Sequence, residues 1–164
     1  MVTIPYGRRD AVAYAHQWAF KRNPAFYDYE HLGGDCTNFA SQCLYAGCHV
    51  MNVTPVWGWY YTDPNRKAPA WTGVGFFAQF LLRAEATAGP FAAAAALEQC
   101  QPGDFVQLLV GGRYTHTPII VAMGAPATAE NTLVAAHSYD ADRRPLSSYQ
   151  VEGFRFLHIL GARR

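Results

Sequence analysis

One cysteine lies in a sequence context suited to nucleophilic catalysis. Cys36 follows Gly33-Gly34-Asp35 and opens a stretch with helical character. A sulfur at a helix N-terminus lies over free backbone N–H groups and the positive end of the helix dipole, and both favour the reactive thiolate. The same N–H groups can bind the negative oxygen of a tetrahedral intermediate. Because most cysteines are structural, a small buried residue at a helix start stays the alternative interpretation of Cys36.

A cysteine nucleophile needs a base, and the sequence contains six histidines. His116 opens a predicted apolar strand, a natural place for an imidazole that faces a helix N-terminus. His137 ends the next predicted strand, so both histidines lie at one end of the sheet if the two strands pair as a hairpin. His137 would then hydrogen-bond the far nitrogen of His116 and fix its tautomer. His31, in the loop before Cys36, is an alternative base.

The sequence predicts no metal and no other cofactor. Its histidines show no H-x-x-x-H spacing and no neighbouring carboxylate cluster, which argues against a zinc hydrolase. The four cysteines lack C-x-x-C spacing, so the sequence does not indicate a zinc ribbon or a thioredoxin-like site. Cys43 lies in an apolar stretch and is interpreted as a buried hydrophobic residue. A disulfide between Cys48 and Cys100 is left open.

Helices are predicted in the N-terminal part of the chain, and strands in the C-terminal part. Apolar spacing predicts helices over about 8–22, 36–46 and 71–86, and the Ala92–Ala96 run predicts a short fourth helix. Predicted strands cover residues 105–110, 115–123, 132–137 and 153–160, with Gly111-Gly112 as a hairpin turn. This segregation favours an α+β fold in which N-terminal helices pack on a C-terminal antiparallel sheet. The length of 164 residues fits a single domain over residues 1–164.

Aromatic residues make up 15% of the sequence and crowd the loop after the helix that carries Cys36. Their flat faces suit a sugar ring or an extended peptide, although core packing accounts for at least half of them. We interpret Trp57 and Trp59 as walls of a substrate cleft, and we add Trp71 and Tyr29 as candidate substrate-binding residues.

Charge and hydropathy exclude several classes of partner. The formal net charge of +1, from 13 basic and 12 acidic residues, gives no electrostatic case for binding nucleic acid. No apolar run is long enough to span a membrane. The first residues lack the charged and apolar regions of a signal peptide. Three locations stay open, namely a longer secreted or cell-wall-associated chain, a delivered toxin and an intracellular amidase. We expect a monomer.

Several motifs, taken in order along nearly the whole chain, resemble the bacterial amidase-domain family, which is itself similar to the CHAP and NlpC-like cell-wall peptidases. The most specific is Asp-Cys-Thr-Asn-Phe-x-Ser-Gln, and the stretches that carry the resemblance are Tyr6–Ala15, Asp35–Gln42, Trp71, Pro102-Gly103-Asp104 and His116–Val121.

This resemblance implies a papain-like α+β fold, with Cys36 as nucleophile and His116 as base. It also implies a polar third residue on the following strand, which matches His137, with Asp140 as the alternative. Related peptidases place a tyrosine near the oxyanion, a role that Tyr29 or Tyr27 would match. The implied activity is cleavage of amide bonds through a thioester, in peptidoglycan or peptides. Two alternatives stay open, namely a catalytically silent binding module of the same fold and an acyl transferase.

Overall fold

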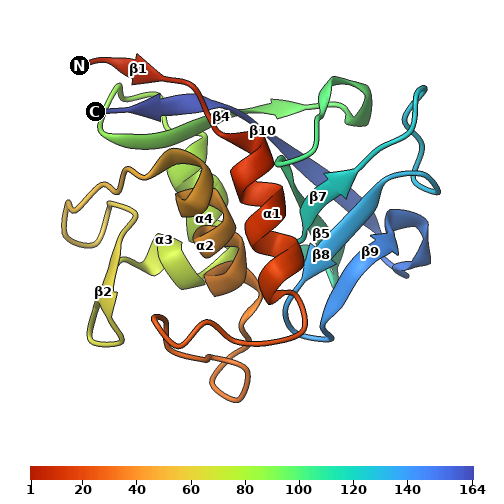
Figure 1. Ribbon diagram of the computed structural model, residues 1–164, viewed down its shortest axis with the longest axis horizontal. Coiled ribbons are helices and arrows are strands. Elements are labelled where there is room, and N and C mark those ends of the chain that lie inside the picture. The colour runs from red at the N-terminus through yellow and green to blue at the C-terminus, as the bar shows by residue number, and fades with distance from the viewer.

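The sheet of this protein is antiparallel and has eight strands, and the helices gather on one side of it (Figure 1). The computed structural model describes residues 1–164. The strands are β1 (Thr3–Ile4), β4 (Gly89–Ala95), β5 (Phe105–Val110), β6 (Arg113–His116), β7 (Ile119–Ala122), β8 (Leu133–Ala136), β9 (Ala141–Pro145) and β10 (Gly153–Arg163). They follow the order β1-β10-β5-β7-β8-β9, with β4 paired to β10 and β6 paired to β5.

Alternating side chains give this sheet two buried faces, as the two-residue repeat of a strand requires. Phe105, Ile119 and Ala135 point into the larger core, under the helices. Their neighbours Val106, Ile120 and Val134 point into a smaller core on the other face, together with Leu146. That second face is covered by loops and by two short 3₁₀ turns, η1 (Leu97–Gln99) and η2 (Leu146–Ser148).

Two helices near the N-terminus form the layer that carries Cys36. The first, α1 (Arg8–Trp18), packs against the second, α2 (Cys36–Cys48), through the fully buried Ala11 and Ala15. All residues of α2 except Tyr45 and Ala46 are buried, so α2 is the central helix of the larger core. A helix enclosed in this way holds its first residue in a fixed position.

The remaining elements lie between α2 and β4 in the sequence. A two-stranded ribbon of β2 (Tyr61–Asp63) and β3 (Arg66–Lys67) leads into α3 (Pro69–Thr72) and α4 (Val74–Leu81). The predicted single helix over 71–86 is therefore two helices, because Gly73 adopts an extended conformation and interrupts the helical path.

The α+β class and the antiparallel sheet are confirmed, but two predicted elements differ. The Ala92–Ala96 region was assigned to a helix and instead forms β4, which pairs with β10 from Gly89 to Ala95. Pairing with an eleven-residue strand outweighs the weak helical preference of a short alanine run. The predicted strand over 115–123 is interrupted at Thr117-Pro118, where the proline lacks a ladder donor.

All four cysteines are free thiols, so Cys48 and Cys100 are not joined. Cys43 is fully buried in the larger core, as its apolar surroundings predicted. None of the helices combines the length and the hydropathy needed to cross a bilayer.

Candidate active site

Cys36 is the first residue of α2, as predicted, and follows a tight glycine turn. Gly33 and Gly34 have φ angles of 88° and 97°, which side chains with a Cβ rarely adopt. Asp35 occupies the N-cap position but makes no side-chain hydrogen bond to the first turn of the helix. The backbone N–H groups of Cys36 and of the next two residues consequently donate to no oxygen of the protein. This leaves a set of donors beside the sulfur for an anionic oxygen.

Cys36 and His116 line the same cavity, which has a volume of about 550 Å³. His116 ends β6 and reaches the cavity from the sheet side, whereas Cys36 reaches it from the helix side. The two side chains make no hydrogen bond with each other, and no protein group hydrogen-bonds the His116 ring. The nearest aromatic neighbour of that ring is Tyr149, with a centroid separation of 6.0 Å.

Both groups are held in their neutral forms. Burial lowers the pKa of His116 to about 4, with a further contribution from the positive charge of Arg144. Burial also raises the pKa of the Cys36 thiol, although its hydrogen bond with the Thr37 hydroxyl, 3.7 Å away, acts in the opposite direction. A neutral imidazole can accept a proton, so His116 is in the protonation state that a general base requires.

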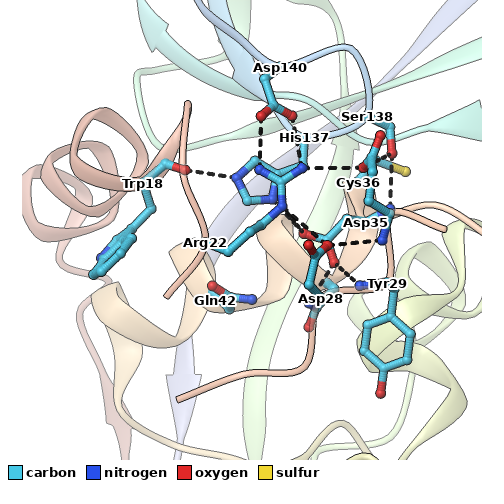
Figure 2. Close-up of polar contacts among 12 residues, drawn as sticks. Trp18, Arg22, Asp28, Tyr29, Asp35, Cys36, Gln42, His137, Ser138 and Asp140 are labelled. Carbon is cyan, nitrogen blue, oxygen red and sulfur yellow. Dashed lines mark hydrogen bonds and ion pairs between the residues drawn. The ribbon is translucent and has the colours of Figure 1, made fainter. Parts of the chain in front are cut away.

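The predicted hydrogen bond between His137 and His116 is absent, because both ring nitrogens of His137 have other partners. Nδ1 lies 2.5 Å from a carboxylate oxygen of Asp35, and Nε2 lies 2.8 Å from the carbonyl oxygen of Trp18 (Figure 2). His137 directly follows β8, and β7 pairs with β8 so that Ile119, three residues after His116, faces Ala135. His116 and His137 therefore lie at the same end of the sheet, as predicted, but do not face one another.

The two partners of His137 are both acceptors, a carboxylate and a carbonyl. An imidazolium, in which both ring nitrogens donate, satisfies both contacts. Asp35 accepts further hydrogen bonds from the backbone N–H of Tyr29, at 2.8 Å, and from the Asn38 side chain, at 2.9 Å. Each member of this ion pair is only 1% exposed. The pair thus anchors the residue immediately before Cys36 to the end of β8.

Arg22 joins this pair to a cluster of carboxylates. Its guanidinium contacts Asp140 at 2.8 and 3.1 Å, Asp28 at 3.2 Å and Glu30 at 3.3 Å, and lies 3.6 Å from Asp35. Asp140, the alternative third catalytic residue, is therefore engaged with Arg22. In Figure 2 the Cys36 sulfur points away from His137 and Arg22. This network supports the N-terminus of α2 from behind and does not enter the cavity.

The aromatic residues predicted to bind substrate lie elsewhere. Trp59 and Trp71 are fully buried, and their indole N–H groups donate to Ser41 and to Asn38 on α2. Tyr29 is buried as well, and its ring points away from Cys36 (Figure 2). These three residues are core residues, so their predicted role in substrate binding is wrong. The sequence could not separate the two cases, because an aromatic residue has the same pattern in a core and in a cleft.

Trp57 is exposed, but it lines a different cavity, of about 600 Å³, that Cys36 does not reach. The alternative base His31 is exposed and does not line the cavity of Cys36. The cavity is also lined by residues that the sequence did not mark as candidates, namely Ser138, Tyr139, Arg144, Tyr149, Gln150 and Val151. They follow β8 or surround η2, and their sequence contains no motif that marks them.

Comparisons with known proteins place this site in a family. A family model described as "Putative amidase domain" matches residues 5–160. The chain belongs to this amidase-domain family. An uncharacterized protein of Bacillus subtilis (strain 168), YhbB, is 33% identical over 142 residues, which are 85% of this chain and 43% of the relative. The chain thus spans less than half the length of that relative. No solved structure matches the chain.

Membership of the amidase-domain family supports hydrolysis of an amide as the reaction class. The family match covers both Cys36 and His116 and most of the sheet, without β1 and the last three residues of β10. No group of three or more histidine, cysteine, aspartate or glutamate side chains is arranged to hold a metal ion.

Proposed function

We propose that this protein is a cysteine-dependent amide hydrolase in which Cys36 is the nucleophile and His116 the general base. The observation that carries the proposal is the meeting of these two side chains in one cavity, at a helix N-terminus whose N–H groups have no protein acceptor. Membership of an amidase family supplies the bond type.

The reaction begins with proton transfer from the Cys36 thiol to the neutral imidazole of His116. The thiolate attacks the amide carbonyl, and the resulting oxyanion accepts hydrogen bonds from the free N–H groups of the first turn of α2. His116 then gives its proton to the leaving amine as the C–N bond breaks, which leaves a thioester. Water, deprotonated by His116, attacks the thioester, so that a carboxylate is released and the thiol is restored.

The resting thiol and imidazole are neutral and not hydrogen-bonded, so the proton transfer is coupled to substrate binding. Catalytic hydrogen bonds are often loose without substrate and tighten in the bound complex. The bound substrate also brings the carbonyl oxygen to the free N–H groups of α2, which stabilise the negative charge that burial otherwise disfavours.

A cysteine at the start of a helix that packs against an antiparallel sheet is the arrangement of papain-like enzymes. We propose that this protein has a papain-like fold and is related to the CHAP and NlpC-like peptidases. Peptides, including the peptide part of peptidoglycan, are the proposed substrates, and the protein is proposed to act as a monomer. His137 is assigned to support of the helix terminus and not to the reacting atoms.

The test combines turnover with selective alkylation. Purified peptidoglycan and a peptide library are incubated with the wild type, with Cys36→Ala and with Cys100→Ala as the matched cysteine control, and new amine and carboxylate ends are identified by mass spectrometry. We expect products from the wild type and from Cys100→Ala but none from Cys36→Ala. Full activity in Cys36→Ala would end the proposal. Saturable binding without products in the wild type would instead favour the silent binding module.

Two further measurements refine the assignment. Iodoacetamide should modify Cys36, which lines a cavity, much faster than Cys43, which is fully buried. An added amine nucleophile distinguishes hydrolysis from acyl transfer, because transfer would yield a new amide whose mass includes that amine.

A further inference from the structure

The cavity shared by Cys36 and His116 contains one permanent charge. Arg144, at the end of β9, is the only lysine, arginine, aspartate or glutamate among its thirteen lining residues. The other lining side chains are apolar, hydroxyl-bearing or amide-bearing, apart from the neutral His116 and the thiol. A cavity with this composition has a positive potential that no side chain inside it compensates.

The partners of Arg144 leave this charge free for a ligand. Its Nε donates to the Ser148 hydroxyl at 2.8 Å and one terminal nitrogen donates to the Ser148 carbonyl at 3.3 Å. Its guanidinium carbon lies 3.7 Å from the centre of the Tyr149 ring. No carboxylate pairs with it. By contrast, the neighbouring Arg143 points elsewhere and contacts Asp142 at 3.3 Å.

Stacking on Tyr149 fixes the guanidinium while leaving donors unused. Two hydrogen bonds to Ser148 occupy two of the five N–H donors of an arginine, and the planar group is held against the ring. The hydroxyl of Tyr149 is itself buried and has no hydrogen-bond partner. A fixed guanidinium with free N–H groups is the arrangement that binds a carboxylate.

We propose that Arg144 binds a carboxylate of the substrate, on the side of the leaving amine. This inference rests on the proposed function, because it takes Cys36 and His116 as the reacting pair. His116 must protonate the leaving amine, so groups beside His116 contact the leaving part of the substrate. Arg144 acts on His116 electrostatically and shares its cavity wall. The substrate class is therefore an acylated amino acid or short peptide that ends in a free carboxylate close to the scissile amide.

The experiment compares two versions of one substrate pool. A library of acetylated tetrapeptides is synthesised once with free C-terminal carboxylates and once as the C-terminal carboxamides, and kcat/KM is measured for each pool by mass spectrometry of the products. A charge-assisted hydrogen bond predicts that the wild type cleaves the carboxylate pool about tenfold or more faster. Arg144→Gln should lose this preference, Arg144→Lys should retain part of it, and Arg143→Gln should retain all of it.

A structural role of Arg144 would lower the rates for both pools together and leave their ratio unchanged. Equal cleavage of the two pools by the wild type, or an unchanged ratio in Arg144→Gln, would therefore overturn the carboxylate proposal while leaving Cys36-dependent hydrolysis intact. Activity that survives in Cys36→Ala would instead overturn the proposed function.

Direct binding covers the case in which no tetrapeptide is cleaved. The two pools are titrated into Cys36→Ala and into Cys36→Ala/Arg144→Gln, and dissociation constants are measured by calorimetry. We expect the carboxylate pool to bind Cys36→Ala about tenfold more tightly than the carboxamide pool, and this difference to vanish in the double variant. Equal binding of the two pools, or absence of binding by both, would refute the carboxylate proposal.

Discussion

Replacement of His137 by leucine tests whether the buried ion pair maintains the N-terminus of α2. Leucine has a volume similar to that of histidine, so the change removes charge and hydrogen bonds and leaves little cavity. After the change the Asp35 carboxylate keeps its hydrogen bonds from the Tyr29 backbone and from Asn38. It loses its closest cation, and the Trp18 carbonyl loses its donor.

The size of the effect follows from burial. Both members of the pair are 1% exposed, and removal of one partner from such a pair costs about 3–5 kcal/mol because the other charge is left uncompensated. Arg22, 3.6 Å from Asp35, provides some compensation, which places the expected loss near the lower end, at about 3 kcal/mol. That loss is a large part of the 5–15 kcal/mol typical of a domain.

A second histidine–aspartate pair in the same protein provides the control. His16 contacts Asp142 at 2.8 Å, but its side chain is 28% exposed, so His16→Leu should cost about 1 kcal/mol or less. Urea unfolding followed by circular dichroism gives both free energies. A charge-free double variant, Asp35→Asn/His137→Leu, should be less destabilised than the sum of its single changes. Equal costs for His137→Leu and His16→Leu, or strict additivity in the double variant, would refute the assignment of His137 as a charged anchor.

Three further predictions concern the site and its support. Burial lowers the folded-state pKa of His116 to about 4, below the unfolded value, so protonation of His116 opposes folding. The free energy of unfolding should therefore fall by about 3 kcal/mol as the pH falls from 6.5 to 4. His116→Asn should flatten the curve of stability against pH in this range, and an unchanged curve would contradict the prediction. Ser41→Ala leaves the buried indole N–H of Trp59 without its acceptor and should cost about 1–3 kcal/mol in urea unfolding, whereas a neutral effect would show that the bond is dispensable. Gly47→Ala places a Cβ 2.3 Å from the Tyr6 ring and should lower the Tm, by an amount that corresponds to about 1–3 kcal/mol; a Tm equal to that of the wild type would show that the ring moves aside freely.

Local signals in the sequence predicted the start of the helix at Cys36 well. Glycines, an aspartate and a cysteine before an apolar helix specify a helix start within a few residues, and α2 begins at Cys36 as predicted. The paired glycines at 111–112 likewise predicted the hairpin between β5 and β6. Each of these features depends on neighbours along the chain, so the sequence alone contains the necessary information.

Features that depend on distant segments were not predictable in the same way. The partner of His137 is decided by the pairing of β7 with β8 and by Asp35, 102 residues away. Trp59 and Trp71 can be buried because acceptors on α2, which is distant in the sequence, accept the hydrogen bonds of their indole N–H groups. Arg144 enters the cavity because β9 pairs with β8, and nothing in the residues around it marks that position.

The two histidines that the sequence placed together have separate tasks, and the separation has a chemical reason. A carboxylate one residue before a nucleophilic cysteine opposes thiolate formation, and Asp35 does raise the pKa of Cys36. A positive charge on His137, 2.5 Å from that carboxylate, opposes its effect and so favours the field of the helix terminus at the sulfur. In the proposed mechanism His116 must be neutral to accept a proton, and an imidazolium as its hydrogen-bond partner would oppose the positive charge that His116 gains. Placing the charged histidine behind α2 and the neutral one in the cavity satisfies both requirements.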